Sequence, residues 1–359
     1  MATPRPRCYV AAMNRSLVIA SLVFAVGCTD DPTLTDPLTD PDGKGDGLGV
    51  ALVETQLASE SRQPSLVTQD DAFIYYVLFT EEDEQHEPQT HTLVRVRKSG
   101  GDGSEKLATL PLTGVNFAAV GGNDIYLLDH ANLYRIAKTG GELATVKAFD
   151  SPWALTADAT GAYVAHQVVE GERSFQRITK VLAGSAQTLE LATATFVTSM
   201  ATDDSSLYWL DETQPNPAIG CGKNAGAAHR IGKSGGLDVT LQVGINCPLS
   251  VVVDGSAAYY TNWSMTTPGY PVVRLPRFGL PQLLGFAGSP EIALEPSHAS
   301  WIAPSAILQR RAKVFGITRE VAPDVEGGLG LVGDATGVYF WRRNDASFAY
   351  ELYRLSRAQ

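Results

Sequence analysis

The chain repeats one pattern of apolar and polar positions: a short apolar run, an acidic turn residue, and an aromatic residue five positions later. Residues 331–341 (LVGDATGVYFW) and 155–165 (LTADATGAYVA) are near copies of each other. Alignment on this phrase finds seven copies, 37 to 51 residues apart. In copy six a serine stands in the aromatic position and a tryptophan follows it. The seven pairs are Asp70/Tyr75, Gly121/Tyr126, Asp158/Tyr163, Asp203/Tyr208, Asp254/Tyr259, Glu295/Ser300 and Asp334/Tyr339.

A second phrase, an arginine followed three positions later by a base, comes after each aromatic residue. Some copies continue into Gly-Gly, a strong signal for a hairpin turn, and then into a third phrase such as KLATL at 106–110. In copy six the phrase reads GITR at 316–319, so the arginine is expected to be lost there. Each copy therefore predicts four short strands. The other phrases are RVRK (95–98), RIAK (135–138), RITK (177–180), RIGK (230–233), RLPR (274–277) and RLSR (354–357).

Four-stranded repeats with a period of about 40 to 45 residues are typical of propeller blades. Neighbours such as Tyr208 and Trp209 point to opposite faces of a strand, and both are large and apolar because another blade packs on each side. Copy seven ends at Gln359 without a fourth strand, whereas residues 50–58 read as a strand without a blade. We expect an all-β, seven-bladed β-propeller of four-stranded antiparallel blades, closed by this N-terminal strand. The alternatives are an open array or six good blades with one decayed copy.

These phrases resemble the repeats of propeller lipoproteins from Gram-negative bacteria, and they are similar to the wider lyase-like seven-bladed and TolB-like six-bladed propellers. The resemblance covers residues 50–359, and the WD dipeptide signature of another propeller class is absent. The shared residues are structural, so the resemblance implies a fold and leaves the activity open. Lyases of this kind assemble an active site from single residues on several blades.

The N-terminal residues 1–27 read as an export signal, because arginines precede a short apolar run at 17–27 that is too short to span a membrane. The run ends at Cys28 after small residues, which resembles the lipobox of bacterial lipoproteins and implies a lipid on the Cys28 sulfur. An ordinary secretory signal is the alternative. Residues 28–49 are rich in Asp, Pro and Thr and are expected to form a disordered tether. The propeller domain follows at 50–359.

The net charge of -11 argues against a nucleic-acid partner, because phosphates favour Lys and Arg. No phosphate-binding or dinucleotide-binding motif occurs, so we expect no cofactor and no bound metal. Asp40, Asp42 and Asp46 alternate as in a calcium loop, but Lys44 and Ala51 stand where such a loop needs ligands. HEPQTH at 86–91 does not have the histidine spacing of a helical zinc motif, and the six histidines are expected to be solvated loop residues.

Two cysteines remain in the propeller region, Cys221 and Cys247. They are expected at the same end of neighbouring blades, where an exported protein can join them as a disulfide; two buried thiols are the alternative. At the opposite end, the turn aspartates such as Asp70 and Asp158 and the bases such as Lys98 and Lys138 lie together. We expect a ring of acid–base contacts on that face, with a basic binding ring as the alternative.

Three long loops, at 79–92, 211–227 and 261–271, should project from one face, and binding residues tend to lie on such loops. We interpret the protein as a lipid-anchored, monomeric binding scaffold of the cell envelope that engages a protein, peptide or glycan through this face.

The alternative is a propeller lyase or hydrolase with its site at the channel mouth, near Asp129, His130, His166 and Asp211. A structural role without a ligand is a third possibility. Trp263 could instead cover a blade edge, and Trp153, Phe117 and Phe196 could plug the channel. The ligand-binding candidates are Trp263, Tyr270, Asn262, His166, Asp211 and Trp153.

Overall fold

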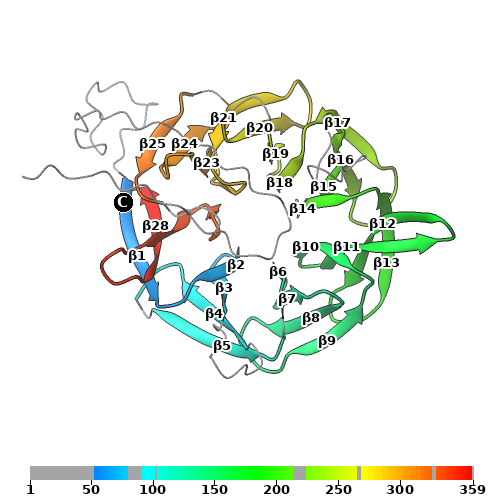
Figure 1. The fold of residues 1–359 in the computed structure, drawn as a ribbon, viewed down its shortest axis with the longest axis horizontal. Coiled ribbons are helices and arrows are strands. Elements are labelled where there is room, and N and C mark those ends of the chain that lie inside the picture. The colour runs from blue at the N-terminus through cyan, green and yellow to red at the C-terminus, as the bar shows by residue number, and fades with distance from the viewer. Residues whose placement is uncertain are drawn as a thin grey trace, which may run out of the picture.

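The computed structural model describes residues 52–79, 90–101, 103–112, 114–212, 224–264, 268–314, 316–325 and 329–357. Within these ranges the chain forms 28 strands in seven four-stranded antiparallel sheets, which stand like blades around a central axis (Figure 1). The predicted seven-bladed β-propeller is confirmed. Copy six is a complete blade, so the alternative of a decayed copy is wrong.

Each of the first four blades follows the chain from the channel to the rim. Blade one contains β2 (Pro64–Gln69), β3 (Phe73–Phe79), β4 (His91–Arg97) and β5 (Ser104–Leu110). Blade two contains β6 (Phe117–Gly121), β7 (Asp124–Leu128), β8 (Asn132–Ala137) and β9 (Ala144–Ala148). Blade three contains β10 (Pro152–Asp158), β11 (Gly161–Glu170), β12 (Arg173–Leu182) and β13 (Thr188–Ala194). Blade four contains β14 (Val197–Thr202), β15 (Ser206–Glu212), β16 (Gly226–Gly232) and β17 (Val239–Ile245).

The remaining blades complete the ring. Blade five contains β18 (Pro248–Val253), β19 (Ala257–Asn262), β20 (Tyr270–Pro276) and β21 (Gln282–Ala287). Blade six contains β22 (Ile292–Leu294), β23 (His298–Ile302), β24 (Leu308–Ala312) and β25 (Arg319–Ala322). Blade seven contains β26 (Val332–Asp334), β27 (Gly337–Arg343), β28 (Tyr350–Arg357) and, from the other end of the chain, β1 (Leu52–Glu60).

We call the face with the turns between first and second strands, and between third and fourth strands, the lower face. The other face is the upper face.

The N-terminal strand closes the ring, as predicted. β1 pairs antiparallel with β28, from Leu52 opposite Arg357 at the lower end to Glu60 opposite Tyr350 at the upper end. Leu57 lies in a buried cluster with residues of blades one and seven. The first and last described strands therefore share one sheet, and unfolding of either opens the ring.

The hydrophobic core is divided among the interfaces between blades. Tyr75 packs with Ile125 of blade two, whereas its neighbour Tyr76 packs on the other side of blade one against Trp341 of blade seven. The Tyr76 and Trp341 rings meet edge to face with centroids 5.1 Å apart. Adjacent aromatic residues are therefore both buried because they serve two different interfaces.

The repeated acidic turn residue holds its turn and reaches the next blade. One carboxylate oxygen of Asp70 accepts the backbone N–H groups of Ala72 and Phe73 at 2.9 and 2.8 Å. The other oxygen accepts the Tyr75 hydroxyl at 2.9 Å and pairs with Lys138 Nζ of blade two at 2.8 Å. The five-residue spacing between aspartate and tyrosine follows from this geometry.

The predicted ring of acid–base contacts is confirmed on the lower face, and its pairs join neighbouring blades. In each pair a base at the end of a third strand contacts the turn aspartate of the preceding blade. Several of these side chains are buried. The five described pairs are Lys98–Asp334, Lys138–Asp70, Lys233–Asp158, Arg277–Asp203 and Lys313–Asp254.

The interface between blades two and three has no such pair. Gly121 occupies the aspartate position of blade two, and a Cβ atom there would lie 2.4 Å from the backbone oxygen of Asp158. In blade three, Lys180 lies opposite Tyr163 and so occupies the arginine position, which leaves Ala183 in the place of the base. The expected register of RITK was therefore wrong by three residues. Lys180 Nζ donates to the backbone oxygen of Lys233, much as Arg95 donates to that of Lys138.

The expected loss of the arginine in copy six is also wrong. The third strand of blade six is β24, and Arg310 lies opposite Ser300 in its register. Arg310 forms a two-point ion pair with Glu295 at 2.7 and 2.8 Å. The phrase RRAK at 310–313 is thus the true copy, and residues 316–319 lead into the fourth strand. Its arginine at the second position, where the other copies have Val, Ile or Leu, hid the phrase from the sequence pattern.

Candidate functional site

Three aromatic side chains, two of them exposed, lie at the upper ends of blades three, four and five. Trp153 in β10 is 47% exposed, and its ring packs edge to face on Phe196 with centroids 5.0 Å apart. Trp263 follows β19 of blade five and is 37% exposed. β10, β14 and β18 lie side by side around the channel. We call Trp153, Phe196 and Trp263 the upper aromatic row.

The other candidates of blade five lie near this row with different exposures. Asn262 is almost buried at the end of β19, and Tyr270 is half-buried at the start of β20. The Trp263 backbone N–H donates to the Cys247 oxygen at 2.9 Å, which fixes the tryptophan beside the start of blade five. Cys247 is buried. Cys221 and much of the three long loops lie outside the described residues, so the disulfide pairing and the loop surface stay predictions.

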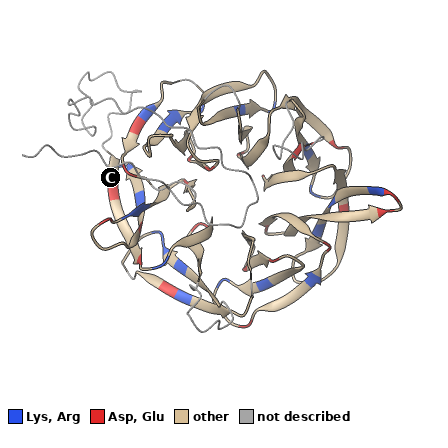
Figure 2. Ribbon diagram, viewed as in Figure 1, with Lys and Arg blue, Asp and Glu red and all other residues tan. Residues whose placement is uncertain are grey.

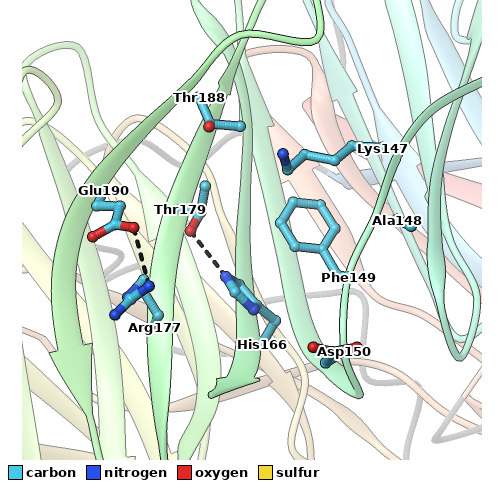
Figure 3. Close-up of a pocket in the computed structure, with 9 residues that line it drawn as sticks. All are labelled: Lys147, Ala148, Phe149, Asp150, His166, Arg177, Thr179, Thr188 and Glu190. Carbon is cyan, nitrogen blue, oxygen red and sulfur yellow. Dashed lines mark hydrogen bonds and ion pairs between the residues drawn. The ribbon is translucent and has the colours of Figure 1, made fainter. Parts of the chain in front are cut away.

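A pocket of about 290 Å³ opens between the outer strand of blade two and the second, third and fourth strands of blade three (Figure 3). Phe149 and His166 approach each other in it, with ring centroids 4.8 Å apart. β11 and β12 are longer than most strands and form the hairpin that projects from the ring (Figure 1). The lining residues are Lys147, Ala148, Phe149, Asp150, His166, Arg177, Thr179, Thr188 and Glu190.

His166 is held as a neutral ring in this pocket. Burial lowers the pKa of His166 and outweighs the opposing effect of its hydrogen bond to the Gln167 backbone oxygen. Nδ1 lies 3.3 Å from that oxygen and Nε2 lies 3.0 Å from the Thr179 hydroxyl. A neutral ring can donate through Nδ1 and accept through Nε2, which satisfies both contacts.

Charged side chains of both signs line the rest of the pocket. Arg177 pairs with Glu190 at 3.0 Å and with Glu170 at 2.9 Å, which ties the second, third and fourth strands of blade three together. Lys147 lies over the Phe149 ring, 5.9 Å from its centroid. An aromatic surface with nearby cationic, anionic and hydroxyl groups can hold a small polar molecule that has one apolar face.

Asp211 has a structural role at the upper end of blade four. It is buried, and its carboxylate accepts the backbone N–H of Phe196 at 2.8 Å and that of Thr195 at 3.2 Å. Its role as a ligand-binding candidate stays a prediction. Sequence reasoning missed that a carboxylate near the end of the second strand can accept backbone N–H groups of the link that enters the same blade.

The proposed enzyme residues at the upper face do not converge. Asp129 caps the turn of blade two through the N–H groups of Ala131 and Asn132 and accepts the Tyr134 hydroxyl. His130 contacts the Asn116 amide. Asp129 and His130 lie in blade two, His166 lies in blade three and Asp211 lies in blade four. Each has its own local partners. Asp129, His166 and Asp211 repeat one structural position, three residues after the tyrosine of each blade, and do not form one site.

The prediction that all six histidines are solvated loop residues is wrong for His91 and His298, which are buried in β4 and β23. His229 lies in β16 and stacks on Trp209 at 5.0 Å. In the described ranges no cluster of three or more His, Cys, Asp or Glu residues could hold a metal ion. None of the described residues belongs to a helix long and apolar enough to cross a membrane. Figure 2 shows basic and acidic residues interspersed around the ring.

No protein-family model matches the chain, and no curated protein sequence matches it. Solved propeller structures do match it. An acylaminoacyl peptidase from Pyrococcus horikoshii is 10% identical with a TM-score of 0.61, covering 84% of this chain and 54% of the peptidase. The chain spans about half the length of the peptidase structures it matches.

Two further structures match over most of their length. An oligogalacturonate lyase in complex with manganese is 12% identical with a TM-score of 0.55, covering 87% of this chain and 94% of the lyase. The N-terminal domain of Nup159 is 11% identical with a TM-score of 0.53, covering 85% of this chain and 96% of that domain. At these identities the likeness shows the fold alone. The fold and these likenesses define the protein as a seven-bladed β-propeller with lyase-like and peptidase-like structural neighbours. One such fold can carry many different functions.

Pattern reasoning from the sequence identified His166 and missed the rest of its pocket. Phe149 and Lys147 belong to blade two, whereas Arg177 and Glu190 belong to blade three. No local motif links these residues, because the contact between two blades brings them together. The two long flanking strands of blade three were the available signal.

Proposed function

We propose that the protein is an exported, lipid-anchored propeller of the cell envelope that binds a protein, peptide or glycan through the upper face of blades three to five. The observation that carries this proposal is the upper aromatic row, in which Trp153 is 47% exposed and rests on Phe196. Tryptophan supplies much of the binding energy at interfaces. A tryptophan supported by a second ring keeps its position and loses little entropy on binding.

The test is capture of a partner from detergent-solubilised envelope by the full-length protein purified from membranes. Three forms are compared: the natural chain, the Trp153→Ala/Trp263→Ala variant, and Phe348→Ala as a matched control. Phe348 is an exposed aromatic residue of blade seven. A partner retained by the natural chain and the control, but lost by the double variant, supports the proposal. Equal capture by all three, or no specific capture, contradicts it.

The anchor is tested separately by the mass of the N-terminal peptide of the mature protein. The proposal expects that the chain begins at Cys28 and that its sulfur carries a lipid. An unmodified cysteine, or cleavage at another position, contradicts the anchor and leaves the upper-face proposal in place. Fractionation of the envelope then locates the protein, which we expect in the outer membrane because Thr29 follows Cys28 without an Asp retention signal.

A second candidate, an enzyme of the lyase or hydrolase kind, is favoured by the pocket around His166. If a bound substrate displaces the Thr179 hydroxyl from Nε2 of the neutral His166 ring, that nitrogen is free to accept a proton from the substrate. Thermal unfolding with monosaccharides and free amino acids as probes tests whether the pocket binds them. A shift in the natural chain that is absent in His166→Gln and kept in Trp153→Ala/Trp263→Ala assigns the ligand to this pocket.

A further inference from the structure

Large apolar side chains project from the lower face at one part of the rim. Phe278 is 93% exposed and Leu280 is 83% exposed in the turn between β20 and β21 of blade five. Val314 and Ile317 are exposed in the corresponding segment of blade six. We call these four residues the lower apolar rim. Exposed apolar residues grouped in this way mark interaction surfaces.

The two turns lie next to each other. The Thr318 hydroxyl, beside Ile317, donates to the Leu284 backbone oxygen at 3.3 Å, and Arg311 of blade six donates to the same oxygen at 2.6 Å. Leu283, in β21 between them, is more than half exposed. The apolar residues of blades five and six therefore lie on neighbouring segments of the lower rim.

The corresponding turns of blades one to three have no large apolar residue at this place, and the turn of blade four has a single exposed leucine, Leu237. Blades one and two have Ser99-Gly-Gly and Thr139-Gly-Gly at this place, and blade three has Ala183-Gly-Ser. A blade does not need large apolar residues in this turn to fold, because those three blades pack without them. The side chains of blades five and six are therefore available for a contact outside the propeller.

The path of the chain indicates what covers this surface. The first described strand enters the ring at Leu52, opposite Arg357 at the lower end of blade seven, and blade seven adjoins blade six (Figure 1). Cys28, the predicted lipid site, precedes Leu52 by 24 residues. Because the predicted tether joins the ring at the lower face, the lower face is the side nearer to the predicted anchor. The net charge of -11 opposes a second copy on the same surface.

We propose that the lower apolar rim docks the propeller on a lipid bilayer, with Phe278, Leu280, Val314 and Ile317 in the boundary between headgroups and acyl chains. The inference rests on the proposed lipid anchor for the direction of the face. Apolar side chains buried at this boundary lie about 5–10 Å deep. Docking in this way points the upper aromatic row away from the membrane.

The test is fluorescence of the full-length, lipid-bearing protein in phosphatidylcholine vesicles, with Phe278→Trp and the matched control Phe348→Trp. Phe278→Trp is expected to add emission that is shifted to shorter wavelength and is quenched by brominated phosphatidylcholine. The emission added by Phe348→Trp, on the upper face, is expected to stay unquenched. Unquenched emission from the first variant, or equal quenching of both, overturns the proposal.

Two further measurements separate the remaining outcomes. Phe278→Ser/Leu280→Ser is expected to speed transfer of the protein between vesicles about tenfold or more, because two apolar contacts with lipid are lost. An unchanged transfer rate overturns the proposal. A dimer of the natural chain that this double variant abolishes would identify a second copy as the occupant and also overturn it. The mass of the Cys28 peptide reports on the anchor independently, and partner capture by Trp153→Ala/Trp263→Ala reports on the upper face.

Discussion

Lys98 of the first blade donates a hydrogen bond to Asp334 of the last blade. The two residues are 236 positions apart and form the same contact that joins other neighbouring blades. Lys98 is buried, so the contact takes place largely away from water. The ring is thus closed twice: by β1 completing blade seven at the rim, and by this acid–base pair on the lower face.

Replacing Asp203 by Asn is expected to lower the free energy of unfolding by about 1–2 kcal/mol. Burial opposes ionisation of Asp203, but hydrogen bonds from the Ser205 N–H, the Tyr208 hydroxyl and Arg277 outweigh it and lower the pKa from 3.8 to about 2. Urea denaturation at pH 7 measures the effect. Asp204→Asn, at the neighbouring exposed position, is the control and should leave stability unchanged.

The turn aspartates also predict how stability depends on pH. The pKa values of Asp70, Asp158, Asp254 and Asp334 are lowered as well, because hydrogen bonds to the carboxylates outweigh the effect of burial. A lowered pKa adds stability above the unfolded value and loses it as pH falls through the folded value. Thermal stability should therefore drop between about pH 4 and pH 2, and less so in Asp203→Asn. An equal drop in both proteins would contradict this role of Asp203.

Gly121→Ala is expected to destabilise the protein by about 2 kcal/mol or more, because a Cβ atom there would lie 2.4 Å from the Asp158 backbone oxygen. Gly255 is the matched control, since no atom lies within 4 Å of its added Cβ and alanine stands in its place in blades three and seven. Gly255→Ala should be neutral or slightly stabilising. Similar melting temperatures for the two variants would show that blades two and three can separate without cost.

Leu57→Ala tests closure by β1. Leu57 is buried in the cluster that joins blades seven and one, so its truncation is expected to cost about 2–4 kcal/mol. Val53 lies in the same strand and is 45% exposed, so Val53→Ala should change stability by less than about 1 kcal/mol. Chemical denaturation of both variants measures the difference. A Leu57→Ala protein as stable as Val53→Ala would mean that β1 does not hold the ring.

Arg177→Ala is expected to change stability by less than about 1 kcal/mol, because its partners Glu170 and Glu190 are exposed. The remaining effect should shrink at high salt, since ions screen exposed pairs. Melting curves at low and at high sodium chloride measure both quantities. A large loss of stability that does not depend on salt would show that Arg177 supports the packing around the pocket between blades two and three.

The repeat in the sequence determined the fold, including the number of blades, the four strands in each and the closing strand, because every blade must satisfy the same turn and bury residues on both faces. The first turn and second strand were placed correctly in the copies that kept the equivalents of Asp70 and Tyr75. The third strands of blades three and six were misplaced where a local match, RITK or GITR, displaced the true register. Only cross-strand pairing, such as Lys180 opposite Tyr163, shows which copy is in register.

The tertiary structure alone decided which residues come together between blades. Asp211 and His166 occupy the same position in two blades, yet one caps backbone N–H groups and the other lines a pocket. Their surroundings differ because the neighbouring blade supplies half of each environment. The apolar turns around Phe278 and Ile317 are likewise separate in the sequence and become neighbours only because blades five and six stand side by side. The repeat determines the turn and the buried residues that the blades share, whereas contacts between neighbouring blades determine the surroundings of each position.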